Sequence, residues 1–297
     1  MNLNLLRIFV AVVEAQSFSR AAEKLDISQP ATSKAVRELE NQLDTVLIER
    51  QGRSLRPSEP GRMLYDYGRS IFALEREADE AIRSFGSLER GQLVIGASTT
   101  IATYWLPPFI ARFHARYPGI RLRLVIANTA HIAEELLSCE IDVALVEGPV
   151  ADPRFDTRPW RTEEMLVVAP RDHSLPQKRV ARPAELADEV WIVREHGSGS
   201  RESTDTTLAA LGIHPSRTIE VGSNEAIVQT VAAGAGLGLV PHICARDQLE
   251  LGRVRRILPQ EAPLQRQLYR MRLPQRPVSH AALAFEALLL EPAPRAG

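Results

Sequence analysis

The sequence predicts a chain of two parts. The first is an all-α N-terminal domain with a winged helix-turn-helix that continues into one long helix, and the second is a larger C-terminal region of α/β architecture. Three observations support this prediction. A capped helix with two distinct faces covers residues 27–40, an apolar heptad repeat covers residues 64–88, and strand-like and helical segments alternate from residue 91 onward.

The helix predicted over residues 27–40 has a well-defined start. Ser28 is a favourable N-cap residue, because its hydroxyl accepts a hydrogen bond from a free backbone N–H of the first turn, and Pro30 fits just inside that start. The apolar residues at helical spacing, which we expect to be buried, are Ala31, Ala35, Val36 and Leu39. The other faces carry polar and cationic side chains that suit base edges and phosphates, although an ordinary amphipathic surface helix has the same pattern.

The neighbouring segments favour a helix-turn-helix. An amphipathic helix is predicted over residues 5–13, and a short helix over residues 17–25 is joined to the next one by the tight connection Asp26-Ile27. Downstream, Arg50, Arg53 and Arg56 fall within seven residues. A hairpin there would form a basic wing for DNA phosphates, whereas the alternative is a solvated loop.

Charge and composition limit the possible functions. The formal net charge is −1, so DNA binding must depend on a local patch, and residues 1–60 contain as many acidic as basic side chains. The two cysteines, Cys139 and Cys244, imply no disulfide framework and suit a reducing cytoplasm. The N-terminal apolar run reads as a helix and not as a signal peptide, and no apolar run approaches the roughly 18 residues of a membrane span.

A second long helix is predicted to begin after Ser58 and to expose an apolar stripe. The stripe follows alternating steps of three and four residues through Leu64, Tyr67, Ile71, Leu74, Ala78, Ala81, Phe85 and Leu88. Such a seam needs a partner helix, either in this chain's own domain or in a second copy. We favour a homodimer, because a helix-turn-helix reads a palindrome only with a two-fold partner, with half-sites about 10 bp apart or a multiple of that.

From residue 91 onward the alternation indicates α/β architecture with mostly parallel strands. The strand-like runs are 93–97, 120–127, 142–146, 166–169, 190–193, 218–221, 237–241 and 264–273. The helical patterns are 104–117, 132–139, 183–187, 201–211, 225–233 and 281–290.

Candidate ligand-binding residues follow the strands, where ligands bind in such sheets. They supply hydroxyls and free N–H groups near the positive ends of helices, which suits an anion, although plain helix capping is the alternative. Arg201, with Arg194, would be the charge partner, and Glu147 would contact a ligand hydroxyl or amine. The candidates are Ser98, Thr99, Thr100, Thr129, Glu147, His196, Ser198, Ser200 and Arg201.

Catalytic and metal motifs do not fit. The GSGSR stretch at residues 197–201 lacks the spacing and lysine of a phosphate-binding loop, and a nucleophile elbow is absent. The histidines do not pair with the cysteines at metal-ligand spacing. We therefore expect no catalysis, no metal and no cofactor. The rival interpretation is a solute-binding module or an enzyme built on the α/β region, with the N-terminal helices serving only assembly.

The N-terminal segments LRIFVAVVEAQSFSRAAEKLDISQPATSKAVRELENQL and LIERQGRSLRPSEPG resemble the winged helix-turn-helix of LysR-type transcriptional regulators. The close match covers about the first sixty residues, and the remainder follows the same layout. The resemblance implies a DNA-binding domain over 1–60, a dimerising linker helix over 61–90 and an effector-binding domain over 91–297. It further implies two Rossmann-like (periplasmic-binding-protein-like) subdomains joined by two crossing strands, 91–163 plus 266–297 and 164–265.

The resemblance also implies a function. We expect a cytoplasmic homodimer or homotetramer that binds promoter DNA and is switched by a small anion. The family's co-inducer cleft is lined by residues that match Ser98, Thr100 and Thr129, and the chain looks most like regulators of sulfur or carbon assimilation. The expected DNA-binding residues are Ser28, Gln29, Pro30, Thr32, Ser33, Lys34, Arg37, Arg50, Arg53 and Arg56.

Overall fold

A computed structural model describes residues 1–51, 54–83, 90–148, 150, 152–175, 180–257 and 262–291. Of the predicted site residues, Arg53, Phe85 and Leu88 lie outside this set, and nothing is described of the side chains of Arg50 and Ala81. The chain forms two compact units. The first comprises Met1–Phe85 with Leu137–Glu140, and the second comprises Gly86–Leu136 with Ile141–Gly297.

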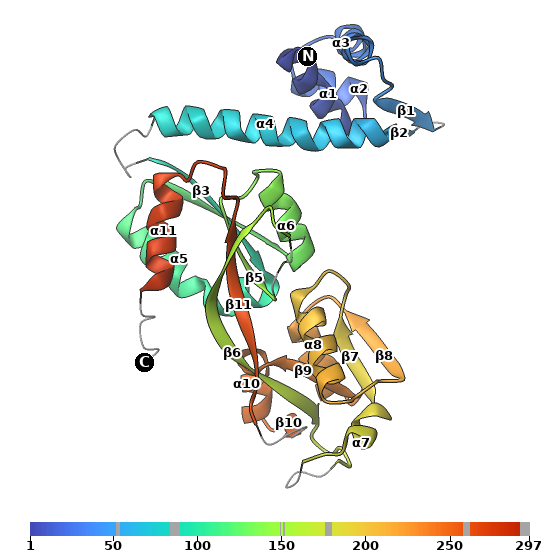
Figure 1. Cartoon of the computed structure of the whole chain (residues 1–297), viewed down its shortest axis with the longest axis vertical. Coiled ribbons are helices and arrows are strands. Elements are labelled where there is room, and N and C mark those ends of the chain that lie inside the picture. The colour runs from blue at the N-terminus through green and yellow to red at the C-terminus, as the bar shows by residue number, and fades with distance from the viewer. Residues whose placement is uncertain are drawn as a thin grey trace. The chain divides into compact units, whose positions relative to one another are not determined.

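The first unit contains the predicted helix-turn-helix, a hairpin and a long helix (Figure 1). Its elements are α1 (Leu3–Ala15), α2 (Phe18–Lys24), α3 (Gln29–Leu43), β1 (Ile48–Gln51), β2 (Ser54–Pro57) and α4 (Glu59–Arg83). The two strands pair antiparallel, with Ile48 opposite Pro57. The apolar faces of α1, α2, α3 and α4 enclose one core around Leu6, Phe9 and Leu39.

Side-chain caps fix the ends of these helices. The Ser28 hydroxyl accepts the Ala31 N–H at 3.3 Å, as predicted for the start of α3. The Ser58 hydroxyl accepts the Gly61 N–H at 3.0 Å before α4. The Glu40 carboxylate accepts the backbone N–H groups of Leu47 and Ile48 at 2.8 and 3.2 Å, and these two bonds tie the chain entering β1 to the end of α3.

The second unit is built on a nine-stranded mixed sheet in the order β4-β3-β5-β11-β6-β9-β7-β8, with β10 paired to β6. The strands are β3 (Gly91–Ser98), β4 (Ile120–Ala127), β5 (Val143–Glu147), β6 (Asp156–Pro170), β7 (Val190–Arg194), β8 (Arg217–Val221), β9 (Leu237–Pro241), β10 (Val254–Ile257) and β11 (Leu264–Arg272). β3 is parallel to β4 and β5, and β7 is parallel to β8 and β9.

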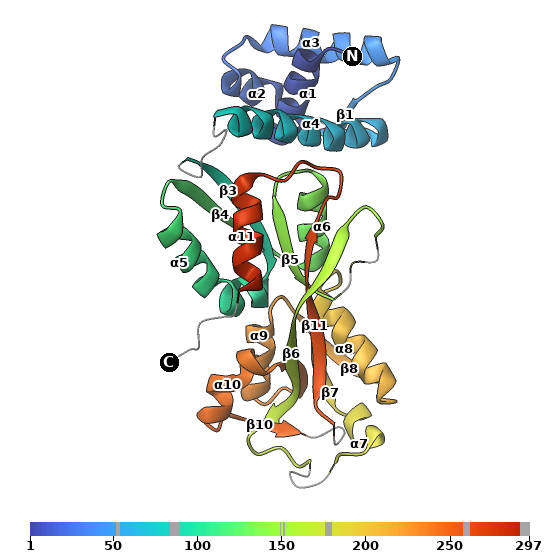
Figure 2. The ribbon, with the colours of Figure 1, turned by 60° about the vertical axis from the view of Figure 1, so that its left-hand side comes forward.

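Two long antiparallel strands, β6 and β11, run through both halves of this unit (Figure 2). β11 also pairs antiparallel with β5 in one half, and β6 pairs antiparallel with β9 in the other. The halves are therefore two α/β subdomains that share the strands β6 and β11. This arrangement agrees with the predicted pair of Rossmann-like subdomains.

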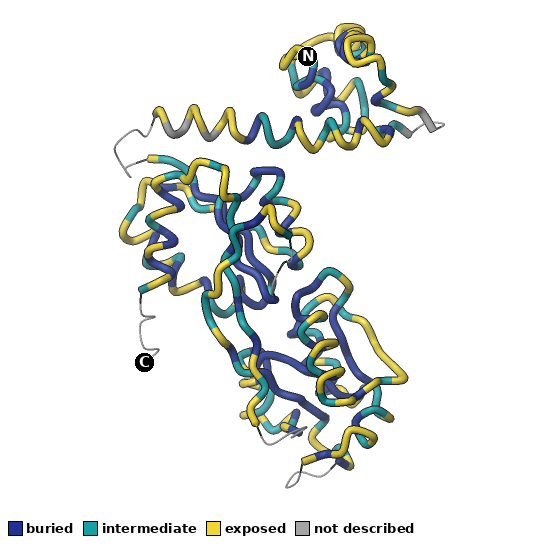
Figure 3. The backbone as a smooth tube through the Cα atoms, in the orientation of Figure 1, coloured by how far each residue is buried: buried dark blue, intermediate teal, exposed yellow. Residues whose placement is uncertain are grey.

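The helices of this unit cover both halves of the sheet. They are the π-helix η1 (Ile101–Trp105), α5 (Pro107–Arg116), α6 (Thr129–Leu137), α7 (Pro183–Ala187), α8 (Gly199–Ala210), α9 (Asn224–Ala232), α10 (His242–Glu250) and α11 (His280–Leu290). Three buried apolar clusters lie beneath them, one in the first half around Phe113 and Phe285, and two in the second half around Trp191 and Val231. The strands β5 and β9 are buried along their whole length (Figure 3).

No helix in the described part of the chain is both long and apolar enough to cross a membrane.

Candidate functional site

The exposed face of α3 carries most of the predicted DNA-binding side chains. Lys34 and Arg37 are exposed, as are Ser28 and Gln29 at the start of the helix. The Gln29 amide donates a hydrogen bond to the Ser33 hydroxyl at 2.8 Å. This bond orders two polar side chains that lie one helical turn apart near the start of α3.

Two predictions on this helix are wrong. Thr32 is completely buried and its hydroxyl donates to the Ser28 carbonyl at 3.1 Å, so it is not a base contact, and Ala31 is exposed. The buried stripe runs through Thr32, Ala35, Val36 and Leu39, so the prediction is confirmed for Ala35, Val36 and Leu39, and Thr32 takes the place predicted for Ala31. The physical reason is that threonine satisfies its hydroxyl within the first turn and can therefore enter the core.

The wing agrees with the prediction as far as it is described. Arg56 lies on β2 with an exposed side chain, and the backbone of Arg50 lies on β1 opposite Leu55. The hairpin follows α3 directly, and the carboxylate of Glu40 at the end of that helix holds its first strand.

The apolar stripe of α4 is divided between two faces. Leu64 and Ile71 pack against the core of the helix-turn-helix, where Gly68 allows close approach to Val10. Tyr67 and Leu74 are 66% and 40% exposed. The predicted seam is therefore only partly free for a partner helix. Two further apolar side chains, Met63 and Ile82, are also exposed on α4, at 61% and 75%.

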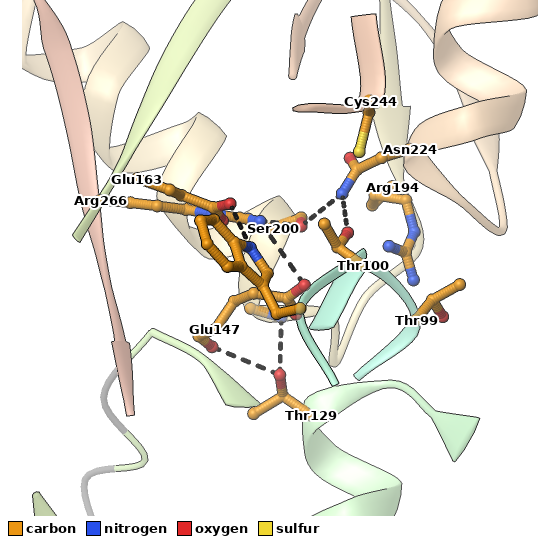
Figure 4. A network of polar contacts seen from close by, with 12 residues as sticks. Thr99, Thr100, Thr129, Glu147, Glu163, Arg194, Ser200, Asn224, Cys244 and Arg266 are labelled. Carbon is orange, nitrogen blue, oxygen red and sulfur yellow. Dashed lines mark hydrogen bonds and ion pairs between the residues drawn. The ribbon is translucent and has the colours of Figure 1, made fainter. Parts of the chain in front are cut away.

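In the second unit a polar cluster forms where the strands of both halves end (Figure 4). The first half contributes Thr100, Thr129 at the start of α6 and Glu147 at the end of β5. The second half contributes Ser200 in the first turn of α8 and Asn224 at the start of α9. Residues that were predicted from separate strand ends are thus brought together.

Direct hydrogen bonds join the two halves in this cluster. The Asn224 amide donates to the hydroxyls of Thr100 and Ser200 at 2.8 and 3.0 Å. The Gly199 N–H donates to the Thr129 hydroxyl at 3.2 Å, and that hydroxyl donates to the Glu147 carbonyl at 3.3 Å. Only glycine fits at position 199, because a Cβ there would lie 1.7 Å from the Glu147 carbonyl oxygen.

Arg266, on the crossing strand β11, is the buried cation that contacts the carboxylates of Glu147 and Glu163. Its side chain is 4% exposed, and its Nε donates to the carboxylate of Glu163 on β6 at 2.5 Å. Its other nitrogens donate to the Ser200 hydroxyl at 2.6 Å and to the Glu147 carboxylate at 3.5 Å. One arginine thus links both crossing strands to both halves.

Three buried polar atoms of this region have no hydrogen-bond partner. They are the hydroxyl oxygens of Ser98 and Ser198 and the amide oxygen of Asn224, within the residues that the structure describes. All three residues are at most 1% exposed. Burying a polar group without a partner costs about 1–3 kcal/mol, so a ligand that offered hydrogen bonds here would recover part of that free energy.

The two predicted cationic partners of an anion are already paired with carboxylates. Arg194 pairs with Glu195 at 2.8 Å, and these contacts lower the pKa of the Glu195 carboxyl although its burial opposes the shift. Arg201 pairs with Asp205 at 2.9 Å and lies 3.6 Å from Glu220. The remaining predicted residues differ in burial, with His196 exposed and Thr99 half-buried.

Residue-by-residue sequence reasoning missed Arg266, Glu163 and Asn224. Asn224 follows β8 and opens α9, so the rule that selected Thr129 would also have selected it. Glu163 and Arg266 are directly opposite each other on β6 and β11. No local signal reveals that pair, because the two residues are 103 positions apart in the chain.

Cys244 lies beside the cluster but is not poised for thiolate chemistry. Burial strongly raises the pKa of its thiol, and the nearby carboxylate of Glu225, 4.0 Å from the sulfur, adds to the shift. In the part of the chain that the structure describes, no group of three His, Cys, Asp or Glu side chains is placed to hold a metal ion.

A winged helix-turn-helix joined to a two-half α/β domain with a polar cluster between its halves defines a ligand-responsive DNA-binding regulator. Comparison with known families makes this specific. The LysR substrate binding domain matches residues 86–293, and the bacterial regulatory helix-turn-helix of the lysR family matches residues 3–62. The chain belongs to the LysR family of transcriptional regulators.

Characterised relatives align over most of the chain. The transcriptional regulator CysL of Bacillus subtilis is 32% identical over 84% of this chain and 83% of its own length. The RuBisCO operon transcriptional regulator of Allochromatium vinosum is 33% identical over 99% of this chain and 97% of its own. Among solved structures, the regulatory domain of Synechocystis CcmR in complex with 2-PG is 28% identical, with a TM-score of 0.62 over 68% of this chain and 96% of that chain.

Proposed function

We propose that this regulator acts as a homo-oligomer in the cytoplasm, binds promoter DNA sequence-specifically through α3 and the wing, and is switched by a small anionic metabolite at the Arg266 cluster. It performs no catalysis in this proposal. The proposed division is residues 1–60 for DNA binding, 61–90 for dimerisation and 91–297 for effector binding, with the latter divided at 164 and 265 into two subdomains.

The observation that carries the effector proposal is the pair of buried, unpartnered hydroxyls of Ser98 and Ser198. Ser98 lies two residues before Thr100 in the first half of the domain, and Ser198 lies two residues before Ser200 in the second half, where it is the N-cap residue of α8. Hydroxyl donors beside the positive ends of helices bind oxyanions without any catalytic group. The resemblance between this chain and a regulatory domain solved with 2-PG agrees with a small-molecule effector.

The charges of the cluster set a condition on this proposal. Glu147 and Glu163 outnumber Arg266, and all three side chains are at most 4% exposed. An anion therefore has to compete with a carboxylate for the guanidinium, and the bond to Glu147, at 3.5 Å, is the weaker of the two by length. We infer that the anion replaces Glu147 as a partner of Arg266, which would loosen β5 from β11 and change the contact between the halves.

Calorimetry tests the effector site. Sulfate, phosphate and 2-PG are titrated into the full chain and into the variants Ser98→Ala and Ser198→Ala. Binding of the preferred anion should weaken about tenfold or more in each variant, the equivalent of about 1.4 kcal/mol. Thr218→Ala, at an exposed position on β8, should bind like the unsubstituted chain. Equal affinity in all four proteins would refute the assignment of the hydroxyls.

Titration of DNA binding against salt tests the DNA-binding surface. The probe is the regulator's own upstream region, and the variants are Arg37→Ala and Arg56→Ala. Each lost phosphate contact should weaken binding and reduce the slope of log affinity against log salt by about 0.9. Arg116→Ala removes an exposed arginine from the effector domain and should leave both quantities unchanged. Unchanged slopes in the two test variants would refute the placement of α3 and the wing on DNA.

A further inference from the structure

A small polar cavity lies in the first half of the effector domain, between the two crossing strands and α11. Its volume is about 70 Å³. A water molecule takes up about 30 Å³ in the liquid, so the cavity has room for a small ion but not for the body of a larger metabolite. We call it the arginine cavity, because three of its six lining residues are arginines. The lining residues are Asp156, Arg158, Arg270, Met271, Arg272 and Glu286.

Strand register places these arginines next to one another. Arg158 of β6 is directly opposite Arg270 of β11, and two residues away along the same strands Asp156 is opposite Arg272. Residues two apart on a strand point to the same face of a sheet, so these four side chains share one face. Like charges directly opposite each other are destabilising. The pair of Arg158 and Arg270 therefore places an excess of positive charge at one point of the sheet.

The two carboxylates of the cavity compensate this charge only in part. The Nε atoms of Arg158 and Arg272 donate to the Asp156 carboxylate at 3.0 and 3.1 Å. These bonds, with the one from Arg158 first, lower the pKa of the Asp156 carboxyl. Glu286 lies 3.6 Å from a nitrogen of Arg270 and from one of Arg272, which is too long for a hydrogen bond. Three guanidinium groups thus face two carboxylates, which leaves an excess of one positive charge.

Arg270 has an unused hydrogen-bond donor. Its side chain is only 15% exposed, and within the described residues its buried Nε has no hydrogen-bond partner. Burying a donor without an acceptor costs free energy, which a ligand with acceptor atoms would recover. The excess of charge and the unused donor therefore both favour an anion that carries oxygen atoms.

The arginine cavity is distinct from the Arg266 cluster. Arg270 follows Arg266 by four residues on β11, a distance of about 13 Å along a strand. Leu268, which is fully buried in the apolar core of the first half, lies between them on the same face. A small anion bound at Arg270 would therefore be a second ligand and not the one proposed for the cluster.

We propose that the arginine cavity is a binding site for a small oxyanion of the sulfate or phosphate class. The bound ion accepts a hydrogen bond from the Arg270 Nε and offsets the charge of Arg158 and Arg270. Charged oxygen acceptors form strong hydrogen bonds to guanidinium groups, so such an ion is preferred over chloride. The proposal does not rest on the effector function proposed for the Arg266 cluster.

Glu286 limits the affinity of this site. Its carboxylate is only 11% exposed and lies near two of the arginines, so it competes with the ion for their charge and also repels the ion. A neutral side chain of the same shape would remove both effects. The proposal therefore predicts opposite changes in affinity for substitutions of Arg270 and of Glu286.

Calorimetry with sulfate provides the test. Sulfate is titrated into the full chain at constant ionic strength, because salt screens charge interactions, and chloride is the comparison ion. The same titration is performed on Ser98→Ala, in which we expect the Arg266 cluster to bind anions more weakly. We expect saturable binding of sulfate in both proteins, and no saturable binding of chloride in either.

Variants of the cavity decide the assignment. Arg270→Met should weaken sulfate binding at least tenfold, and Arg270→Lys should give an intermediate loss, because lysine keeps the charge but loses the planar fork. Glu286→Gln should tighten sulfate binding at least threefold. A misfolded variant would not gain affinity, so this second variant keeps the test decisive if Arg270→Met is unstable. Arg246→Met removes an exposed arginine of α10 and should bind sulfate like the unsubstituted chain.

Three results would overturn the proposal. The first is the absence of saturable sulfate binding, and the second is equal affinity in Arg270→Met and the unsubstituted chain. The third is unchanged or weaker binding in a Glu286→Gln variant that thermal unfolding shows to be folded. Loss of sulfate binding in Ser98→Ala but not in Arg270→Met would assign the ion to the Arg266 cluster and likewise contradict the proposal. Normal binding in Ser98→Ala with a loss in Arg270→Met would support it, whether or not the cluster binds an effector.

Discussion

At the scale of single residues, Gly199 determines how closely the two halves of the effector domain approach. Its N–H bonds to the Thr129 hydroxyl, and the space above its Cα is taken by the Glu147 carbonyl oxygen. A side chain at this position would push the start of α8 away from the end of β5. The glycine is required for close approach and not for an unusual backbone angle.

Gly199→Ala should therefore destabilise the effector domain by about 1–3 kcal/mol and weaken effector binding, since the added methyl group cannot be accommodated without backbone movement. The measurements are thermal unfolding and anion titration. Gly222→Ala is the matched control, because no atom lies within 4 Å of its added Cβ. Equal melting temperatures for the two variants would contradict the role assigned to Gly199.

Arg266→Met should be among the most destabilising single changes in the domain. It leaves the buried carboxylates of Glu147 and Glu163 without their cation, and breaking a buried ion pair in this way costs about 3–5 kcal/mol. Denaturant unfolding measures the loss. Arg272→Met is the control from the same strand, where a more exposed arginine should contribute at most about 1 kcal/mol. A loss no larger than that of the control would show that the two glutamates find other partners.

At the scale of elements, the strand and helix pattern of the sequence predicted most of the sheet. β4, β9 and α7 begin and end where expected. β6 was predicted only over 166–169 but extends from Asp156, because its first ten residues are mostly polar and do not alternate with apolar ones. α10 was missed because only Cys244 and Ala245 of its nine residues are buried, which leaves almost no apolar stripe to detect.

The candidate site was predictable to the extent that local rules define it. Strand ends followed by hydroxyl residues selected Ser98, Thr129 and Ser200, and Thr129 and Ser200 form part of the cluster. The cation was not predictable, because the strand-end rule selects Arg201, at the start of a helix, and passes over Arg266, which lies within β11. The two arginines differ in their carboxylate partners. Strand register places Arg266 opposite Glu163 on the neighbouring strand, whereas Arg201 pairs with Asp205 four residues further along the same helix.

The long helix α4 supports a prediction about assembly. Leu74 is 40% exposed and lies on the proposed dimer seam, whereas Ile71 packs against the core of the helix-turn-helix. Leu74→Asp should therefore dissociate the dimer without unfolding the DNA-binding domain, as measured by sedimentation and circular dichroism. Leu251→Asp, at a 61% exposed leucine of the effector domain, should leave the oligomer intact. An unchanged sedimentation coefficient for Leu74→Asp would place the dimer contact elsewhere.

At the scale of the whole molecule, the proposed function requires that effector binding at one site changes the free energy of DNA binding at another. The proposed DNA-binding surface lies in the first compact unit and the Arg266 cluster in the second. An effector can change DNA binding only if it binds one state of the protein more tightly than the other. The direct bonds between the two halves, such as Asn224 to Thr100, are the contacts that such a preference would alter.

This coupling is reciprocal, which makes it measurable from both ends. If the anion with the largest effect on thermal unfolding changes promoter affinity by a given factor, promoter DNA must change the affinity for that anion by the same factor, typically 5–150-fold or about 1–3 kcal/mol. Fluorescence anisotropy of labelled DNA gives one factor and calorimetry of the protein–DNA complex gives the other. Asn224→Ala removes the hydrogen bond to Thr100, one of those that join the halves, and should reduce both factors together. If the anion binds free protein and complex equally, it is a structural ion, and the switch must respond to a different molecule.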